Sequence, residues 1–384
     1  MGCSLGGEGH LIPLAEVGHA IARAGHEALV LVPRSLAASA ARTGLPYRIG
    51  EEPPRAFVDQ LWQRVRAGPA DAVAGLIDRE LFAERCTHSM LPAAREVRHI
   101  WQPDFVVREP CEYSSAIVAR EAGIPHAQVG VSLAAIEFDV LAMVTSIIDR
   151  FASGLAAAIA AAPYLSAFPP SLDPSRWPDT RRFRPRAAAG VLGSGSPSAE
   201  PPLVYMTFGT VLGHRPEASG VYRTALDAVA GLPARVLLTV GRGIDPLSLG
   251  PLPENARVEQ WVDQEEVLRE ATVVICHGGS GTTFGALAAG VPLVICPMFA
   301  DQFHNGQAVQ DAGAGVVVRS AATPAGGLRL LTPNDAEGLR QAVEDVLDQP
   351  AYRDAATRIA SEMSAMPALD EVVTRLLRLG SGRV

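Results

Sequence analysis

The sequence predicts an α/β protein built from two similar halves, each with a parallel sheet. Three observations support this prediction. In the first half, apolar strand-like runs alternate with amphipathic helical stretches, an order that requires parallel pairing of the strands. Residues 168–202 then break the rhythm with a stretch rich in Pro, Gly and Ser. After this stretch the same alternation restarts.

The first half opens on a glycine loop at residues 6–10, followed by apolar residues at helical spacing up to a helix-stopping Gly25. "EALVLV" and "PDFVVREP" then read as strands, "SSAIVAREAG" as a helix and "PHAQVGVS" as a further strand. A loop of this kind normally follows a strand, yet only "MGCSL" precedes it. Either the first strand is very short or the numbered chain lacks its true beginning.

The second half repeats the pattern with "PLVYMTFGT", "ARVLLTVG", "ARVEQWV", "ATVVICHGG" and "VPLVICPM". We therefore expect an N-terminal domain at 1–167, a linker at 168–202 and a C-terminal domain at 203–365. A final amphipathic helix at 366–384 is expected to pack back on the N-terminal domain. The ligand cleft is expected between the domains, at the carboxyl ends of the strands.

Composition excludes several kinds of function. The chain has a formal charge of −8 and no lysine, so all 33 basic residues are arginine. Schiff-base, pyridoxal and P-loop lysine chemistry are thereby excluded, and an acidic chain without a basic run is a poor nucleic-acid binder. The lysine-free composition also suggests a GC-rich bacterium of actinomycete kind.

No cofactor or metal site is predicted. The five cysteines are scattered without a C-x-x-C pair, and the nine histidines show no H-x-x-x-H or H-E-x-x-H pattern. The sequence also shows no apolar run of membrane-spanning length and no secretory signal. We expect a reduced, cytoplasmic protein that binds no membrane; its oligomeric state stays open, with a homodimer among the options.

The stretch "VVICHGGSGTTFGALAAGVPLVICPMFADQFHN", residues 273–305, carries the strongest chemical signal. A buried strand ends in a glycine loop that opens a helix, and such a loop presents backbone N–H groups to phosphate oxygens. Small residues would also allow close strand–helix packing, which needs no ligand. A dinucleotide site competes as well, because Gly279, Gly281 and Gly285 with Asp301 downstream nearly match its fingerprint.

Upstream, Trp261 stands three residues before Gln264 in "EQWVDQEEVL" and offers a flat face for a base or sugar, although a lone Trp is commonly core. Trp-x-x-Gln, then His-x-Gly-x-Gly, then Asp-Gln is an ordered set. Together these motifs resemble the donor signature of inverting nucleotide-sugar glycosyltransferases of the GT-B fold. The closest resemblance is to the bacterial branch that decorates antibiotics. "GHLIPLAEVGHAIARAGHEA", "PDFVVRE" and "YMTFGT" extend the resemblance to most of the chain.

The resemblance implies two Rossmann-like domains facing across a cleft and a donor site in the second. Trp261 and Val262 would contact the nucleobase, and Asp301 and Gln302 the sugar hydroxyls. The ribose role of Gln264 is less secured, because Asp263 stands where the family frequently has proline. The diphosphate would be held by a larger set: Gly209, Thr210, His277, Gly279, Ser280, Gly281 and Thr282.

The same resemblance places His10 at the position of the catalytic base, which takes a proton from the acceptor. A structural or capping histidine is the alternative. The family commonly has Asp after "PDLVV-x" to orient this base, whereas this chain has Glu109, with Glu112 nearby. His19 and His26 are read as structural, and His304 as either lining the cleft or lying on the surface.

The implied function is metal-independent, inverting transfer of a deoxysugar from a nucleotide diphosphate, dTDP in most of this branch, to a polyketide-like small-molecule aglycone. Apolar residues between 56 and 150 would either line the acceptor pocket or form core: Phe57, Trp62, Leu81, Phe82, Met90, Phe138, Leu141 and Met143. Three rivals remain: an NAD(P) oxidoreductase, a sugar-nucleotide epimerase or hydrolase, and a non-catalytic helper that binds the sugar nucleotide.

Overall fold

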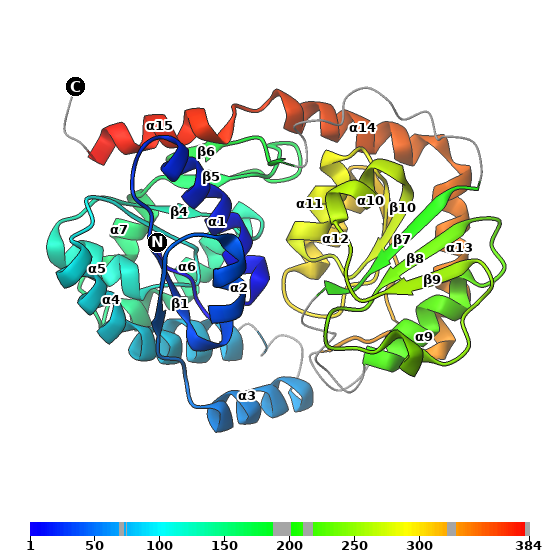
Figure 1. The fold of residues 1–384 in the computed structure, drawn as a ribbon, viewed down its shortest axis with the longest axis horizontal. Coiled ribbons are helices and arrows are strands. Elements are labelled where there is room, and N and C mark those ends of the chain that lie inside the picture. The colour runs from blue at the N-terminus through cyan, green and yellow to red at the C-terminus, as the bar shows by residue number, and fades with distance from the viewer. Residues whose placement is uncertain (69–72, 74, 187–200, 210–217, 321–327, 381–384) are drawn as a thin grey trace. The chain divides into compact units, whose positions relative to one another are not determined.

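The chain folds into two compact units, Met1–Arg184 with Met366–Val384, and Pro185–Ala365. The structure is a computed structural model that describes residues 1–68, 73, 75–186, 201–209, 218–320 and 328–380 (Figure 1). Both units are α/β with wholly parallel sheets, as the alternation predicted.

The sheet of the first unit consists of two groups of strands joined by the first residues of the chain. β2 (Tyr47–Gly50) pairs with β1 (Val30–Pro33), and β3 (Val106–Arg108), β4 (His126–Val129), β5 (Tyr164–Ser166) and β6 (Thr180–Arg182) follow in that order. Gly2 forms bridges to both Leu31 and Arg108. The residues before the glycine loop therefore occupy a strand position between β1 and β3, reduced to one bridged residue.

Two hydrophobic clusters cover the two faces of this sheet. One is built mainly from η3 to α7, the other from α1, α2 and the C-terminal helix. The helical elements of this unit before the C-terminus are α1 (Glu8–Arg23), η1 (Arg34–Leu36), α2 (Ala37–Thr43), α3 (Arg55–Ala67), the π-type segment η3 (Gly75–Cys86), α4 (Thr87–Trp101), α5 (Ser114–Ala122), α6 (Ala134–Ile148) and α7 (Leu155–Ala161).

The expected linker begins too early at residue 168. Residues up to Arg184 belong to the first unit and include β6. Trp177 stacks on Tyr164 with ring centroids 4.9 Å apart, and its Nε1 donates to the Ala134 carbonyl at 3.0 Å. The Pro- and Ser-rich composition made this segment look like a linker. It is held in the first unit by the packing of a buried aromatic side chain, which leaves no regular pattern in the sequence.

The C-terminal helix α15 (Leu369–Gly380) lies beside α1 in the first unit (Figure 1). Val372, Val373 and Leu376 are buried in the cluster that α1 also lines. At the rim of this contact the Arg23 guanidinium donates to the Asp370 carboxylate at 2.6 Å. Both side chains are more than half exposed, so the buried apolar residues supply most of the attachment.

The second unit has one sheet in the order β12-β11-β10-β7-β8-β9. Its strands are β7 (Leu203–Thr207), β8 (Arg235–Thr239), β9 (Ala256–Glu259), β10 (Ala271–Cys276), β11 (Leu293–Ile295) and β12 (Gly315–Val317). The central strands β7 and β10 are almost wholly buried, as expected for a parallel sheet covered on both faces.

The helical elements of this unit are α9 (Ala218–Val229), η5 (Pro246–Leu249), α10 (Gln264–Glu270), α11 (Ser280–Ala288), α12 (Gln302–Asp311), η6 (Pro333–Asp335), α13 (Ala336–Asp348) and α14 (Pro350–Ala365). Along the chain, β7 to β9 are added toward one edge of the sheet and β10 to β12 toward the other. The strand order therefore reverses between the neighbouring strands β7 and β10. Ligands of open α/β sheets bind at such a point, beyond the carboxyl ends of the strands.

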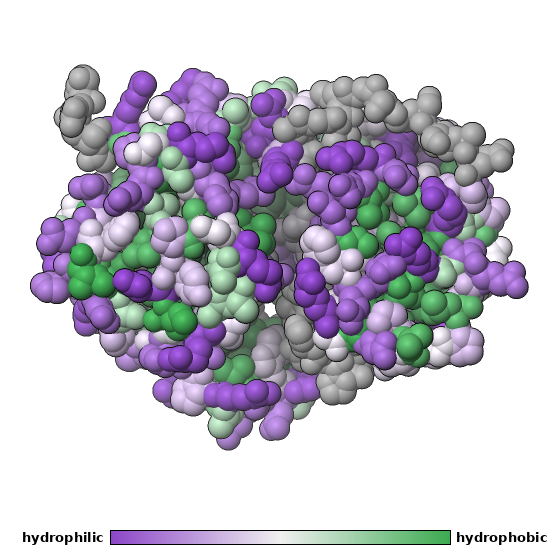
Figure 2. Space-filling view, viewed as in Figure 1, coloured by the Kyte–Doolittle hydropathy of each residue, from purple (hydrophilic) through white to green (hydrophobic). Residues whose placement is uncertain are grey.

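The surface is mainly hydrophilic on the face of each unit shown in Figure 2, with hydrophobic side chains in small groups. Large exposed apolar residues are scattered, and Trp261 is one of them at 60% exposure. Among the described residues, no helix combines the length and the apolar character that crossing a membrane would require.

Candidate functional site

His10 lies in the first turn of α1, directly after the glycine loop. The loop bends because Gly7, the residue before the helix, has a φ of +79°, a conformation that favours glycine. Gly6 is required for another reason. A Cβ on it would stand 2.2 Å from the His10 ring, so only glycine leaves room for the imidazole.

The His10 ring binds a buried carboxylate. Its Nδ1 lies 3.0 Å from Oε2 of Glu109, which is fully buried, while 19% of the His10 side chain is exposed. In the neutral ring this contact puts the proton on Nδ1 and the lone pair on Nε2. Such an imidazole can take a proton at Nε2 while the carboxylate stabilises the resulting cation.

Two backbone groups hold the carboxylate in place. Glu109 Oε1 accepts from the Ser4 N–H and Oε2 from the Cys111 N–H, each at 2.7 Å. Burial by itself would raise the pKa of Glu109. The charge and hydrogen bond of His10, with the two N–H donors, outweigh it and set the pKa below its usual value of 4.5. Glu109 is therefore ionised at neutral pH.

The turn that carries Glu109 is organised by a buried arginine. The Arg108 guanidinium is fully buried and donates to the carbonyls of Glu109, Pro110 and Glu112 at 2.9–3.0 Å. Both Glu112 oxygens accept from the Ser115 N–H at 3.1 Å, at the start of α5. Of the two candidate acids, Glu109 contacts His10, and Glu112 caps a helix.

Four of the eight apolar residues considered for an acceptor pocket are buried in the core. Leu81, Phe82, Met90 and Leu141 are each less than 9% exposed and belong to one cluster on this face of the sheet. These four therefore form core, and a pocket role for the other four, Phe57, Trp62, Phe138 and Met143, stays a prediction. Phe82 still lies near the chemistry, because its ring centroid is 5.8 Å from that of His10.

One group of potential metal ligands occurs within the described ranges. His10, Glu109 and Cys111 offer atoms within 4.8 Å of one another. Burial, with the charge of Glu109, raises the pKa of the Cys111 thiol well above its usual value. A protonated thiol is a poor ligand, so the cluster is better described as a His–carboxylate pair with a neighbouring thiol.

In the second unit, β10 ends at Cys276 and the loop at 277–279 leads into α11. His277 lies between two glycines: a Cβ on Gly209 would stand 2.7 Å from its ring, and one on Gly279 would stand 2.4 Å from its Nε2. Gly209, which follows β7, also has a φ of +76°. Both glycines therefore make room for this histidine. Thr210 lies outside the described residues.

His277 is a neutral hydrogen-bonding group. Burial lowers its pKa to about 4, although the Asp301 carboxylate and the Thr207 carbonyl act in the opposite direction. Nδ1 is buried and makes no hydrogen bond to the described residues. A neutral imidazole keeps one donor and one acceptor nitrogen, so the ring can form a neutral hydrogen bond with a ligand oxygen.

Two helix starts converge beside this loop. Ser280 begins α11, and its Oγ donates to Asp301 Oδ2 at 3.2 Å, where Asp301 is the residue before α12. The buried Asn305 amide donates to the Gly278 carbonyl at 2.8 Å and to Ser280 Oγ at 3.1 Å. Backbone N–H groups of helix starts attract anions, so this arrangement suits a diphosphate.

The remaining donor candidates differ in exposure. Asp301 is partly exposed, and it follows Ala300, which has a φ of +55° that is unusual for alanine. Gln302 is only 4% exposed, and its Oε1 accepts from the N–H groups of Met298 and Phe299 at 2.9 and 3.2 Å. Gln302 thus braces the loop after β11, and a sugar contact stays a prediction.

Gln264 and Thr282 come together: Nε2 of the first donates to Oγ1 of the second at 3.3 Å. Asp263, where the resemblance showed a departure, caps α10 by accepting from the Glu265 and Glu266 N–H groups. Gly281 is open, with nothing within 4 Å of a Cβ built on it. The hydrogen bond between Gln264 and Thr282 joins the start of α10 to the start of α11.

Trp261 is not a core residue. The Arg242 guanidinium lies 4.9 Å from the centroid of its ring, and neighbouring Val262 is partly buried. An exposed indole can stack a nucleobase. Among the other histidines, His26 and His304 are exposed and His19 is partly buried.

Sequence reasoning missed Arg108, Arg242 and Asn305. Arg242 and Asn305 contact partners distant in sequence, and Arg108 bonds nearby backbone carbonyls, which no side-chain motif marks. Asn305 alone had a usable signal, because it lies one helical turn after Asp301 on the same face of α12.

Comparison with known proteins gives the family. Residues 223–379 match the model of the C-terminal domain of erythromycin biosynthesis protein CIII-like proteins. The chain is 30% identical to an L-demethylnoviosyl transferase of Streptomyces niveus over 95% of this chain and 93% of the relative. It is 32% identical to the elloramycin glycosyltransferase ElmGT of Streptomyces olivaceus over 75% and 71%.

Solved structures show the same fold. The spinosyn rhamnosyltransferase SpnG complexed with thymidine diphosphate has a TM-score of 0.73 at 24% identity, covering 96% of this chain and 97% of that one. The same enzyme complexed with spinosyn aglycone has a TM-score of 0.75 at 23% identity, covering 98% and 99%. This chain is therefore a GT-B glycosyltransferase of the antibiotic-biosynthesis family, which transfers sugars to natural-product aglycones.

Proposed function

We propose that this chain transfers a deoxysugar from dTDP to an apolar, polyketide-like aglycone by a single displacement that inverts the anomeric carbon. The observation that carries the proposal is the His10–Glu109 pair, at 3.0 Å and with the carboxylate fully buried. A hydroxyl that attacks the anomeric carbon must lose its proton, and a histidine oriented by a carboxylate can act as the base that takes it.

In the proposed step, His10 Nε2 takes the proton of the acceptor hydroxyl as its oxygen bonds to the anomeric carbon. The bond from that carbon to the phosphate oxygen breaks, and the electron pair leaves with the nucleoside diphosphate. Glu109 stabilises the imidazolium and remains ionised throughout. Attack opposite to the leaving group inverts the configuration.

The second unit would hold the donor. The starts of α11 and α12, the Ser280 hydroxyl and neutral His277 would bind the diphosphate, and Trp261 the base. We propose that these protein groups serve in place of a divalent cation. The thymidine diphosphate complex of the related SpnG structure supports a thymidine nucleotide.

Calorimetric titration with dTDP, UDP and NAD, in chelator-treated buffer, tests the donor assignment. We expect dTDP to bind more tightly than UDP, and His277→Ala to weaken dTDP binding by about tenfold or more. His304→Ala is the matched control, because this histidine is exposed and should leave affinity unchanged. NAD binding with neither nucleotide bound would refute the donor assignment.

The rate of sugar transfer tests the role of His10 as base and the proposed independence from a metal ion. His10→Ala should abolish transfer to a panel of phenolic and polyketide acceptors while leaving dTDP affinity unchanged, and His26→Ala, also exposed, serves as its control. Added EDTA should leave the rate unchanged. NMR of the product should show the opposite anomeric configuration from the donor; retention would contradict the single displacement.

A further inference from the structure

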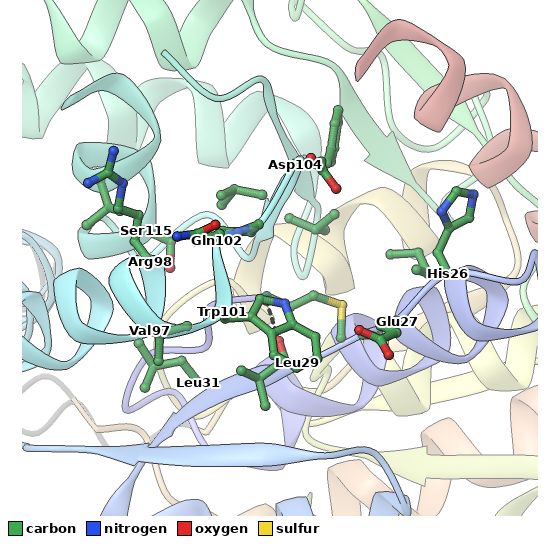
Figure 3. A pocket seen from close by; sticks show the side chains of 18 of the residues that line it. His26, Glu27, Leu29, Leu31, Val97, Arg98, Trp101, Gln102, Asp104 and Ser115 are labelled. Atoms are coloured by element: carbon green, nitrogen blue, oxygen red, sulfur yellow. Dashed lines mark hydrogen bonds between the residues drawn. The ribbon is translucent and has the colours of Figure 1, made fainter. Parts of the chain in front are cut away.

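A cavity of about 680 Å³ lies in the first unit around the amino ends of β1 and β3 (Figure 3). Val97 and Trp101 contribute apolar side chains to its wall. His10 and Glu109 lie at the opposite, carboxyl ends of the strands, where open α/β sheets bind their ligands. The cavity is therefore separate from the catalytic pair. A further functional group lies instead at the carboxyl edge of the second sheet, in the side-chain amide of Asn305.

Asn305 lies near the start of α12 and is fully buried. Its side-chain NH2 group donates to the Gly278 carbonyl at 2.8 Å, to Ser280 Oγ at 3.1 Å and to Asp301 Oδ2 at 3.3 Å. Its Oδ1 atom is also buried and has no hydrogen-bond partner among the described residues. Within this part of the chain the amide therefore acts through its NH2 group, and all three acceptors lie in or beside the predicted donor site.

The glycine loop lies directly against the start of α12. Gly278 has a φ of +88°, a conformation that favours glycine. A Cβ on it would stand 2.9 Å from the Gln302 carbonyl oxygen and 2.9 Å from Cγ2 of Ile295, so the backbone approaches more closely here than a side chain would allow. This close approach brings the Gly278 carbonyl within reach of the short Asn305 side chain.

The hydrogen bond from Asn305 also sets the direction of a neighbouring N–H group. The Gly278 carbonyl and the Gly279 N–H belong to one peptide group, and in a planar trans peptide they point in opposite directions. The described chain contains no cis peptide bond. Exposure rises along the loop, from buried Gly278 through half-buried Gly279 to exposed Gly281. Because the carbonyl is held toward the interior, the Gly279 N–H points toward the open side of the loop.

That N–H group is the first of a row at the start of α11. The Thr283 N–H donates to the Gly279 carbonyl at 3.0 Å, which is the first hydrogen bond of the helix. The N–H groups of Ser280, Gly281 and Thr282 precede this bond, and such groups are the ones that a helix start offers to an anion. Rotation of the peptide before Gly279 would turn the first donor of the row away, so its orientation decides how many N–H groups an anion meets.

We propose that Asn305 is a positioning residue for sugar transfer: its NH2 group fixes the Gly278–Gly279 peptide so that the Gly279 N–H faces the diphosphate of the donor. The same NH2 group and the Ser280 hydroxyl both donate to Asp301 Oδ2. The carboxylate predicted to bind the sugar is thereby joined to the loop predicted to bind the diphosphate. This inference rests on the donor assignment made under the proposed function.

Two replacements remove the NH2 group. Asn305→Leu keeps the size of the side chain, and Asn305→Ser tests the same loss without added bulk. Asn255→Leu is the matched control, because this side chain also donates through one NH2 group to three acceptors in the second unit, yet it precedes β9 at the amino end of the sheet. The three acceptors are the carbonyls of Val229, Leu232 and Ala234, at 3.0–3.2 Å.

Calorimetry with dTDP in chelator-treated buffer measures donor binding, and the Tm of each variant checks that the chain is folded. We expect both Asn305 variants to bind dTDP about tenfold or more weakly than the unaltered chain and than Asn255→Leu. Thymidine, which has no phosphate, should bind all of these proteins alike.

NMR of protein labelled at the glycine nitrogens observes the Gly279 N–H directly. Addition of dTDP should shift this resonance in the unaltered chain and in Asn255→Leu, and much less in the two Asn305 variants. Gly279→Ala identifies the resonance by its loss.

The outcomes separate this inference from the donor assignment on which it rests. Failure of dTDP to bind the unaltered chain would overturn both. Equal dTDP binding by the unaltered chain and both Asn305 variants, with the Gly279 shift retained, would overturn the positioning role alone. An equal loss in Asn255→Leu, or an equal loss of thymidine affinity in the Asn305 variants, would assign the effect to general destabilisation and overturn the positioning role as well.

Discussion

Replacing Glu109 with glutamine tests the catalytic pair without changing the size of the side chain. The carboxylate accepts hydrogen bonds from three donors: Ser4 N, Cys111 N and His10 Nδ1. Glutamine has one acceptor oxygen, so its NH2 group must face at least one of these donors. If the amide oxygen takes the place of Oε1 and accepts from the Ser4 N–H, the NH2 group faces both the Cys111 N–H and His10 Nδ1, and it favours the wrong tautomer of the ring.

The size of the effect follows from the charge. At a charge separation of about 4 Å and an effective dielectric constant of about 20, the carboxylate stabilises the imidazolium by about 4 kcal/mol. That energy corresponds to roughly 10³-fold in rate. Because glutamine can keep part of the hydrogen bonding, we expect kcat/KM to fall by about 10²- to 10³-fold. The donor facing the NH2 group adds a stability cost of about 1–3 kcal/mol.

The assay is release of dTDP in the presence of an acceptor, with dTDP affinity measured separately by calorimetry. Glu112→Gln is the matched control, since Glu112 is also buried, lies three residues on, and bonds Ser115 in place of His10. Burial raises the pKa of Glu112, so a neutral side chain is tolerated there. A loss of less than threefold for Glu109→Gln, or an equal loss for Glu112→Gln, would refute the reasoning.

Three further predictions concern the second unit. Gly279→Ala should weaken dTDP binding by about tenfold or more, since its Cβ would displace the His277 ring, while Gly338→Ala, in α13 and with open space around it, should not. Equal affinities for the two variants in calorimetry would contradict this. Trp261→Ala should cost about tenfold in dTDP affinity and little in Tm, because the side chain is 60% exposed, and Trp261→Phe should restore most of the affinity. The folded-state pKa of His277, about 4, lies below its usual 6.5, so stability is lost as pH falls from about 6.5 toward 4, where the unfolded chain takes a proton that the folded chain refuses. His277→Gln should flatten this share of the dependence in thermal unfolding at pH 7.5 and 5; an unchanged slope would count against a buried neutral ring.

Much of the fold could be predicted from local patterns. The spacing of apolar residues and the glycines that end an element can be read from a short stretch of sequence. For this reason "ATVVIC" followed by a glycine loop predicted β10 and the start of α11 correctly. The end of the first unit could not be placed in this way. Trp177 and β6 are stabilised by Tyr164 and the Ala134 carbonyl, which lie 13 and 43 residues away in the chain.

The candidate site, like the fold, could be predicted from the sequence only in part. His10 and His277 were singled out by the family resemblance, with glycines around them in sequence as well as in space, and their roles stay predictions. The choice between Glu109 and Glu112 depends on how the buried Arg108 folds the turn after β3, which no spacing encodes. Which apolar residues form core could not be predicted from the sequence, because hydrophobicity marks core and ligand contact alike.

The exposed position of Trp261 has a practical consequence. The chain has four tryptophans, and Trp62, Trp101 and Trp177 all belong to the first unit. Indole emission from the second unit therefore comes from one side chain, with the Arg242 guanidinium 4.9 Å from its ring centroid and solvent over much of the rest. A base stacked on that ring would change its quantum yield and the wavelength of its emission. The protein thus carries its own fluorophore at the predicted nucleotide site.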